Sequence, residues 1–225
     1  MTTALICAMP MELAPLVKKL GLTRVSKQRA EGDGVVAIYT GMGTALATKS
    51  TEALLDDVTG ITKVVVFGIT GAVDNETPIG ALIVPEKVRN SETGEDFTPH
   101  DANGHTAKGI MWTTNIITPP HELPPLLAQG VVSLDMETAA IAKSCEARGI
   151  PWSVFRTVSD NPDSEITDEV FKLANQDGTM NWGNVAKFFL TKPHKIPAML
   201  RLAKGGRVAT NNAADAAISA FKNAG

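Results

Sequence analysis

Three acidic residues between Val131 and Asp160 have the types and spacing that could do chemistry together. Asp135 and Glu137 follow one apolar run, and Asp160 ends the next apolar run along the chain. In an open α/β sheet, ligands bind outside the carboxyl ends of the strands, where these three side chains are expected. The pattern therefore predicts a site lined by carboxylates at the mouth of a sheet.

The elements that must position these acids can be read from the same stretch. Apolar runs predict strands over Val131–Leu134 and Trp152–Val158, and the pattern between them predicts a helix over Glu137–Arg148 that Gly149 and Pro151 end. A single helix start needs only one capping acid, so two acids there favour a role beyond capping. Asp160 precedes Asn161-Pro162-Asp163 and could equally begin a turn.

Three earlier segments also follow strands and carry candidate residues. Glu12 comes after Met9 and Pro10, where an acid suits either the positive end of a helix dipole or a catalytic base. The glycines of TGMGTALA, residues 40–47, suit a tight turn or a cradle of backbone amides. FGITGAVD, residues 67–74, suits a turn capped by Asp74 or a close approach of a ligand to Thr70 and Gly71.

Other common chemistries lack their residues in this sequence. The four histidines show no metal-ligand spacing, and the two cysteines form no pair for zinc. No dinucleotide fingerprint, P-loop or Gly-x-Ser-x-Gly elbow occurs. Carboxylates are the remaining catalytic groups, and neither a metal nor a cofactor is expected.

Composition indicates a globular protein with a substantial core. The chain has 225 residues, of which 44% are hydrophobic and 20% charged, and we expect one domain over residues 1–225. Its net charge is −3 with scattered Lys and Arg, so a nucleic-acid partner is not expected. No signal peptide or membrane span is visible, which favours the cytoplasm. Both cysteines are expected to be buried, reduced and inert.

Strand and helix patterns alternate along the first two thirds of the chain, which predicts a three-layer α/β/α sandwich around a central mixed sheet. Further strands are expected at Ala4–Ala8, Val35–Thr40, Lys63–Gly68, Ala81–Val84 and Ile110–Thr113, and further helices at Met11–Leu20, Ala45–Leu55, Asp168–Ala174, Gly183–Leu190, Ile196–Lys204 and Ala213–Phe221. The last two helices are separated by Gly205–Gly206. The polar segment Asn90–Gly109 is expected to be a lid or a partner-contact loop.

With these segments placed, the chain resembles the nucleoside phosphorylase and nucleosidase superfamily, and within it the methylthioadenosine/S-adenosylhomocysteine nucleosidases. The resemblance rests on four motifs in order: CAMPMEL at 7–13, TGMGTALA, FGITGAVD followed by IGALIVPEKV, and LDMETAAIAKSCEARGIPWSVFRTVSD. It implies a homodimer that acts on small purine nucleosides, with residues 97–101 as the loop beside the partner's site.

The resemblance also implies a role for each matching residue. Asp160, helped by Ser159, would protonate N7 of a departing purine, and Glu12 would activate the attacking water. Glu137 would bind the ribose hydroxyls. Met136 and Met9 would pack on the sugar, while Thr70, Gly71 and Ile117 complete the expected substrate-binding set.

The sequence departs from the family pattern in two places. The segment before the Met-Glu motif carries Asn115 and Ile117 where the family usually has an acid and an aromatic residue, which bears on base stacking and purine choice. The tail KPHKIPAMLRLAK, residues 192–204, looks more like members associated with hopanoids, which act on adenosylhopane. That resemblance implies a large apolar 5′ substituent.

Several functions remain open at this point. Hydrolysis of an adenine nucleoside is favoured because Glu12 and Val66 stand where the phosphorylases of the family have phosphate-binding arginines. The alternatives are a phosphorylase, a nucleosidase or phosphorylase of the adenosylhopane type, a non-catalytic nucleoside-binding protein, and a Rossmann-type cofactor binder.

Overall fold

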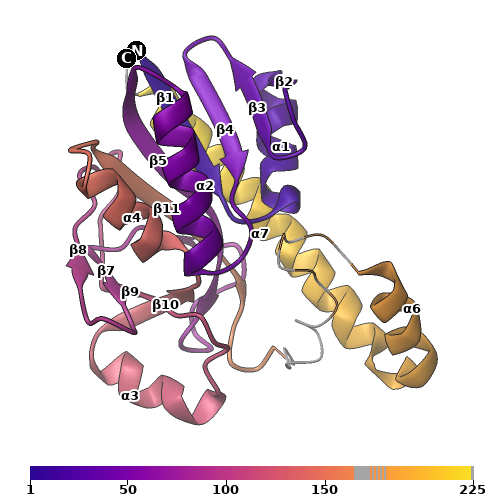
Figure 1. Cartoon of the computed structure of the whole chain (residues 1–225). Coiled ribbons are helices and arrows are strands. Elements are labelled where there is room, and N and C mark those ends of the chain that lie inside the picture. Colours follow the sequence, from indigo (N-terminus) through magenta and orange to yellow (C-terminus); the bar gives the residue numbers. More distant parts are fainter. Residues whose placement is uncertain (165–172, 174, 176, 178, 180, 224–225) are drawn as a thin grey trace.

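One twisted sheet forms the centre of the computed structural model, which describes residues 1–164, 173, 175, 177, 179 and 181–223 (Figure 1). Its strands are β1 (Thr2–Cys7), β2 (Thr23–Arg24), β3 (Arg29–Gly32), β4 (Val35–Tyr39), β5 (Ile61–Ala72), β6 (Leu82–Ile83), β7 (Lys87–Asn90), β8 (Asp96–Phe97), β9 (Ile110–Thr113), β10 (Val131–Asp135) and β11 (Trp152–Asp160). The helices are α1 (Pro10–Leu20), α2 (Thr44–Asp57), α3 (Leu123–Ala128), α4 (Thr138–Glu146), α6 (Trp182–Thr191) and α7 (Ile196–Lys222), with short 3₁₀ turns at Pro120–Glu122 and Pro193–Lys195.

Strand β5 is the central element, because three other strands pair with it. It runs parallel to β1 along its first half and parallel to β11 from Val64 to Gly71, and Gly71 and Ala72 then pair antiparallel with β10. The run Val64–Phe67 is fully buried, as expected for a strand covered on both faces. The carboxyl ends of β1, β5 and β11 consequently meet where β10 crosses.

Helices cover both faces of the sheet in pairs. Helices α2 and α4 contribute Ala47, Leu54 and Ile141 to the core on one face, while α1 and α7 contribute Leu13 and Ala213 to the core on the other face. The pairs are visible on either side of the sheet in Figure 1. The predicted three-layer sandwich around a mixed sheet is confirmed.

Most predicted elements agree with the structure to within a few residues, and the differences have physical reasons. The predicted break at Gly205–Gly206 is wrong, because α7 is continuous through both glycines. A Cβ on Gly205 would lie 3.2 Å from the carbonyl oxygen of Ser159, so the glycine allows the helix to pack closely against the end of β11. The helix predicted at Asp168–Ala174 falls almost wholly outside the described residues.

The polar segment Asn90–Gly109 is not a simple loop, since it contains β8, which pairs with β7. The side chain of Phe97, in β8, is buried in the core of the same chain, and Asp101 forms an ion pair with Lys63 at 3.2 Å. Phe97 is therefore unavailable to a partner subunit's site.

Helix α6 and the first half of α7 form a lobe that projects from the sheet (Figure 1). Val185 and Phe188 of α6 pack there with Leu173 and Met199. Along the described part of the chain, none of the helices combines the length and the apolar character needed to span a bilayer.

Candidate active site

Glu12 is fixed at the start of α1, just beyond the end of β1. Its Oε2 accepts hydrogen bonds from the backbone N–H groups of Ala8 (2.9 Å) and Met9 (2.8 Å), and its Oε1 accepts one from Ile69 of β5 (2.8 Å). The side chain is completely buried. The helix thus begins with an acid that closes its own first turn and also bridges to the central strand.

The space for this carboxylate exists because residue 68 is glycine. Gly68 has a φ of +142°, and a Cβ there would overlap Oε1 of Glu12 and lie 3.0 Å from Nη1 of Arg156. A side chain at this position would displace the acid, the guanidinium or both. The small residues of the FGITGAVD segment therefore make room for the chain's own polar groups.

Arg156 is the charged centre of the site, in the middle of the buried strand β11. It is 1% exposed. Its Nη2 lies 2.7 Å from Oδ2 of Asp135 and 3.3 Å from Oε2 of Glu137, while Nη1 donates to the carbonyl of Ile69 at 3.1 Å and Nε donates to Oγ1 of Thr138. A buried cation is tolerated only with such partners, so the guanidinium and these carboxylates must be considered as one unit.

Asp135 is the partner that performs the helix-capping role. Its Oδ2 accepts from the backbone N–H of Thr138 at 2.8 Å and of Glu137 at 3.2 Å, and its Oδ1 accepts from the hydroxyl of Thr113 at 2.6 Å. Because Asp135 closes the start of α4, Glu137 is left free for another role.

Glu137 links α4 to the glycine turn before α2. Its Oε1 accepts the N–H of Gly43 at 2.9 Å, and the next amide, of Thr44, donates to Oδ1 of Asn115 at 2.9 Å. Nδ2 of Asn115 in turn donates to Oε1 of Glu92. The amides of the TGMGTALA turn thus bind the protein's own side chains, and Asn115 holds this turn in place.

Burial sets the protonation of these acids. It raises the pKa of Glu12, although Arg156 and the three backbone donors act in the opposite direction. Burial also raises the pKa of Glu137 to about 7, opposed by Arg156 and reinforced by Asp135. A carboxylate with a raised pKa is a stronger base once it is ionised, and the contacts with Arg156 and the backbone donors favour the ionised form.

Asp160 lies at the end of β11, opposite Gly71 of β5. Its Oδ1 accepts a hydrogen bond from the hydroxyl of Ser159, and a Cβ on Gly71 would lie 3.1 Å from its Oδ2. Burial raises the pKa of Asp160, and the Ser159 hydroxyl only partly offsets this. Unlike Glu137, Asp160 has no contact with the Arg156 guanidinium among the described residues, so this cation does not oppose the effect of burial on its pKa.

The remaining predicted residues surround this arrangement to different degrees. Thr70 is buried and donates to the carbonyl of Leu134 at 2.7 Å, which ties β5 to β10. Met9 and Met136 are half-buried beside Glu12 and Glu137 in sequence. Ile117 is half-buried in the segment after β9, and its contact with a base stays a prediction.

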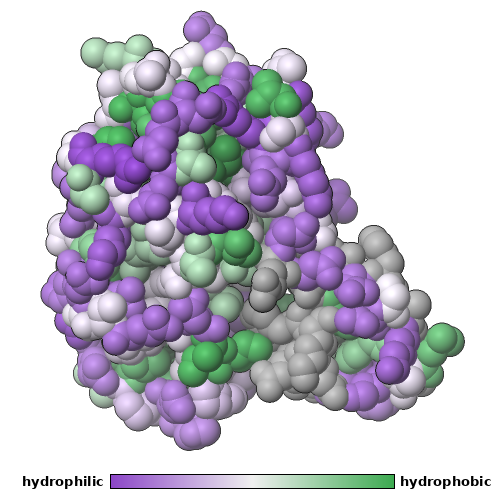
Figure 2. Space-filling view, in the orientation of Figure 1, coloured by the Kyte–Doolittle hydropathy of each residue, from purple (hydrophilic) through white to green (hydrophobic). Residues whose placement is uncertain are grey.

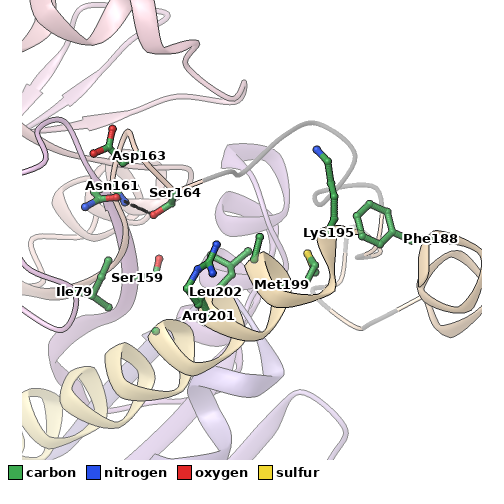
Figure 3. Close-up of a pocket in the computed structure, with 12 residues that line it drawn as sticks. Ile79, Ser159, Asn161, Asp163, Ser164, Phe188, Lys195, Met199, Arg201 and Leu202 are labelled. Atoms are coloured by element: carbon green, nitrogen blue, oxygen red, sulfur yellow. Dashed lines mark hydrogen bonds between the residues drawn. The ribbon is translucent and has the colours of Figure 1, made fainter. Parts of the chain in front are cut away.

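A cavity of about 230 Å³ lies next to Ser159, between the turn after β11 and the helical lobe (Figure 3). Ile79, Phe188, Met199 and Leu202 give it an apolar lining, and Lys195, Arg201 and Asn161 add polar groups. Asn161 is held by a hydrogen bond from the hydroxyl of Ser164, drawn in Figure 3. The cavity therefore extends the Ser159–Asp160 end of the site toward α7.

The structure brings Glu12 and Glu137 together around Arg156. Glu12 contacts Ile69 of β5, and Asp160 lies opposite Gly71, two residues farther along the same strand. The sequence analysis did not identify Arg156 or the threonines that support it. The signal was present, because an arginine within a predicted buried strand must be buried and paired.

Within the described part of the chain, no three His, Cys, Asp or Glu side chains are grouped to hold a metal ion. Both cysteines are buried and free, as predicted.

Substitution of Arg156 by Met is expected to lower the free energy of unfolding by about 3–5 kcal/mol at pH 8, because it leaves buried carboxylates unpaired. The loss should shrink as the pH falls toward 6, since Glu137 then takes up a proton in the folded state and the unpaired charge disappears. Urea unfolding at both pH values measures the effect.

Arg148→Met is the matched control, because Arg148 forms an exposed ion pair with Asp56. Such a pair stabilises by at most about 1 kcal/mol and should show little dependence on pH in this range. Equal losses in the two variants would contradict the role given to Arg156.

Comparison with known proteins shows the family and the fold of the chain. The sequence matches the family model of the phosphorylase superfamily over residues 2–129 and 105–190. Among solved structures, the fold is similar to a mutant of the nucleosidase MTAN from Helicobacter pylori with 5′-methylthioadenosine in its active site (TM-score 0.73, 14% identity, covering 99% of this chain and 98% of that one). It is equally similar to futalosine hydrolase of the same organism (TM-score 0.73, 14% identity, 99% and 97% covered).

A third similar structure is the 5′-methylthioadenosine/S-adenosylhomocysteine nucleosidase from Colwellia psychrerythraea in complex with adenine, with a TM-score of 0.70, 21% identity, and 99% and 95% of the two chains covered. These likenesses confirm the predicted fold. With the family match over most of its length, the chain belongs to the phosphorylase superfamily.

Proposed function

We propose that this protein hydrolyses the N-glycosidic bond of a purine nucleoside that bears a 5′ substituent, and that it releases adenine. The observation that carries the proposal is the composition of the buried charged cluster. Three carboxylates, on Glu12, Asp135 and Glu137, act on the single guanidinium of Arg156. Such a cluster suits a developing sugar cation and an attacking water.

Cleavage of the bond between the sugar and the base separates charge. The anomeric carbon becomes positive as the bond to N9 breaks, and the electron pair moves onto the purine. Asp160 supports the departure by donating a proton to N7, which it can do because burial favours its protonated form. Ser159 orients the Asp160 carboxyl through its hydroxyl.

The attacking water is activated by Glu12. As its oxygen bonds to the anomeric carbon, one of its protons passes to the carboxylate, so that the net reaction consumes one water and yields a free sugar and the base. Three backbone donors hold the Glu12 carboxylate rigidly, which limits the reorganisation required during the step. Its raised pKa improves its strength as a base.

Glu137 binds the ribose hydroxyls in this proposal, and Met9 and Met136 pack on the sugar. One oxygen of Glu137 faces Gly43 and the other faces Arg156, which fixes the plane of the carboxylate. Thr70, Gly71 and Ile117 complete the substrate-binding set near the base.

Phosphorolysis is disfavoured by the same cluster. A phosphate nucleophile requires cationic donors that are free to bind it, but the guanidinium of Arg156 already donates to Asp135, Glu137, Thr138 and Ile69. The surrounding carboxylates leave the cluster net negative when they are ionised, which repels phosphate.

The cavity beside Ser159 provides room for a substituent beyond the base and sugar, and its apolar lining favours an apolar group. The similar solved structures include proteins named for methylthioadenosine, S-adenosylhomocysteine and futalosine. From the family resemblance we further propose that residues 1–225 form one domain that acts as a cytoplasmic homodimer. Light scattering at several protein concentrations tests the oligomeric state.

Product analysis tests the reaction directly. Adenosine, inosine, 5′-methylthioadenosine, S-adenosylhomocysteine and adenosines with longer 5′-alkyl groups are each incubated in phosphate-free buffer, and the sugar product is identified by mass spectrometry. We expect free sugar and adenine, with no gain in rate on addition of phosphate. Sugar 1-phosphate formed only with added phosphate would establish a phosphorylase, and tight binding without turnover would establish a non-catalytic protein.

Asp160→Asn is expected to lower kcat by about 10²- to 10⁴-fold with a small change in KM, because the variant cannot donate the proton. The wild-type profile of kcat/KM should fall at low pH as Glu12 becomes protonated and at high pH as Asp160 loses its proton. The residual activity of the variant should lack the fall at high pH. Asp33→Asn, in an exposed turn, is the control, and an unchanged rate for Asp160→Asn would refute the assigned role.

Gly68→Ala is expected to lower kcat/KM by at least about 10²-fold, because a Cβ displaces the Glu12 carboxylate from its position and catalysis depends on sub-ångström placement. Gly60→Ala is the matched control, since Gly60 also has a positive φ (+78°) but its Cβ would meet open space. Steady-state kinetics of folded variants measures the difference. Similar rates for the two variants would contradict the packing argument.

A further inference from the structure

The segment from residue 178 to residue 214 has an unusual charge. It contains six of the 21 basic residues of the chain, Lys187, Lys192, Lys195, Arg201, Lys204 and Arg207, and none of the 24 acidic residues. The chain as a whole is negatively charged. Lys and Arg are scattered over the sequence as a whole, whereas this segment carries a net charge of +6.

These basic residues lie on the projecting lobe, and α6 turns the apolar residue Leu190 outward from it. Val185 and Phe188 point into the small core of the lobe, whereas Lys187 and Leu190 lie on the opposite, exposed side. Leu190 is 84% exposed. A single exposed leucine is common on protein surfaces, so Leu190 is informative only together with the other exposed apolar and basic side chains of the lobe.

The first half of α7 presents a second mixed stripe. Leu200, Arg201, Lys204, Arg207 and Val208 are all exposed, and their spacing of three and four residues places them along one side of the helix. Leu200 is 65% exposed. Figure 2 shows hydrophobic surface at the outer end of the lobe beside hydrophilic surface. Cationic and apolar side chains thus alternate on the outside of the lobe.

Three basic residues of this surface are without an ion pair in the described part of the chain. Among the described residues, Lys187, Lys204 and Arg207 form no ion pair, whereas Lys19 pairs at 2.8 Å with Asp215, on the later part of α7. Basic residues without an ion pair in the structure thus cluster on the projecting part of the helix. Free cations beside exposed leucines fit a partner that is anionic at its surface and apolar beneath it.

We propose that the lobe formed by α6 and the first half of α7 docks on an anionic membrane surface. Lys187, Lys204 and Arg207 would contact lipid headgroups, and Leu190 and Leu200 would enter the boundary between headgroups and acyl chains. Nucleic acid would match the charge but offers no apolar layer to the leucines. The proposal does not depend on the reaction that the buried site catalyses.

Co-sedimentation with vesicles tests the proposal on the full-length protein. The wild type should bind vesicles of phosphatidylglycerol and phosphatidylcholine, bind much less to phosphatidylcholine alone, and lose affinity as salt is raised. The triple variant Lys187→Glu, Lys204→Glu, Arg207→Glu should bind the anionic vesicles at least about 100-fold more weakly, since each basic residue near such a surface strengthens binding by about fivefold.

The matched control reverses three exposed lysines on other parts of the molecule, with Lys18→Glu, Lys49→Glu and Lys108→Glu. This variant has the same net charge as the lobe variant and should retain most of the vesicle binding. A similar loss of binding in both variants would show that only the overall charge matters, and would overturn the proposal. Both variants should keep the wild-type rate on a water-soluble nucleoside, which separates this proposal from the proposed reaction.

A second variant tests the apolar contribution, because charge alone would also attract nucleic acid. Leu190→Ser with Leu200→Ser should weaken vesicle binding by at least about tenfold while leaving its salt dependence in place. Binding of the wild type to single-stranded RNA but not to vesicles, or loss of self-association in the leucine variant without any vesicle binding, would overturn the membrane proposal.

Discussion

The rest of the site depends on one buried guanidinium. Arg156 lies in the hydrophobic interior on β11, where an unpaired charge would be prohibitively costly, and it is stable there only because Asp135 and Glu137 approach from the start of α4. The same pairing makes it possible to bury those acids. The pairing also requires glycine at position 68, because the guanidinium and Glu12 occupy the volume where a side chain at that position would lie.

This arrangement divides the carboxylates into two electrostatic environments along β5. Glu12 and Glu137 share the field of Arg156 and accept hydrogen bonds from backbone donors, and both interactions oppose the rise in pKa that burial causes. Asp160 is buried with only the Ser159 hydroxyl to offset the loss of solvent, which favours its neutral form. Acids of the same chemical type thus lie in different surroundings, as a division between proton donation and charge stabilisation in one reaction requires.

The sequence alone predicted the layers, the strands at whose ends the acids lie, and the acids themselves, because buried strands and capped helices leave strong local patterns. Asp135 and Glu137 show the limit of such patterns. The sequence showed two acids where a helix start needs only one, but it did not show which of them caps α4, because Asp135 is held by Thr113 from another strand. The break predicted at Gly205–Gly206 was wrong for a similar reason. Those glycines serve a close contact with the end of β11, and local propensity carries no information about that contact.

Helix α7 connects the two unusual features of the molecule. Its first half carries exposed basic residues and the exposed Leu200, and its second half packs on the sheet through Ala213 and its neighbours. Between them, Gly205 lies against the carbonyl of Ser159, and the carbonyl of Ala209 accepts a hydrogen bond from Thr157 on β11. The part of α7 from which the lobe projects therefore packs directly against the strand that ends at Ser159 and Asp160. One helix thus joins the exposed cationic surface to the wall of the buried site.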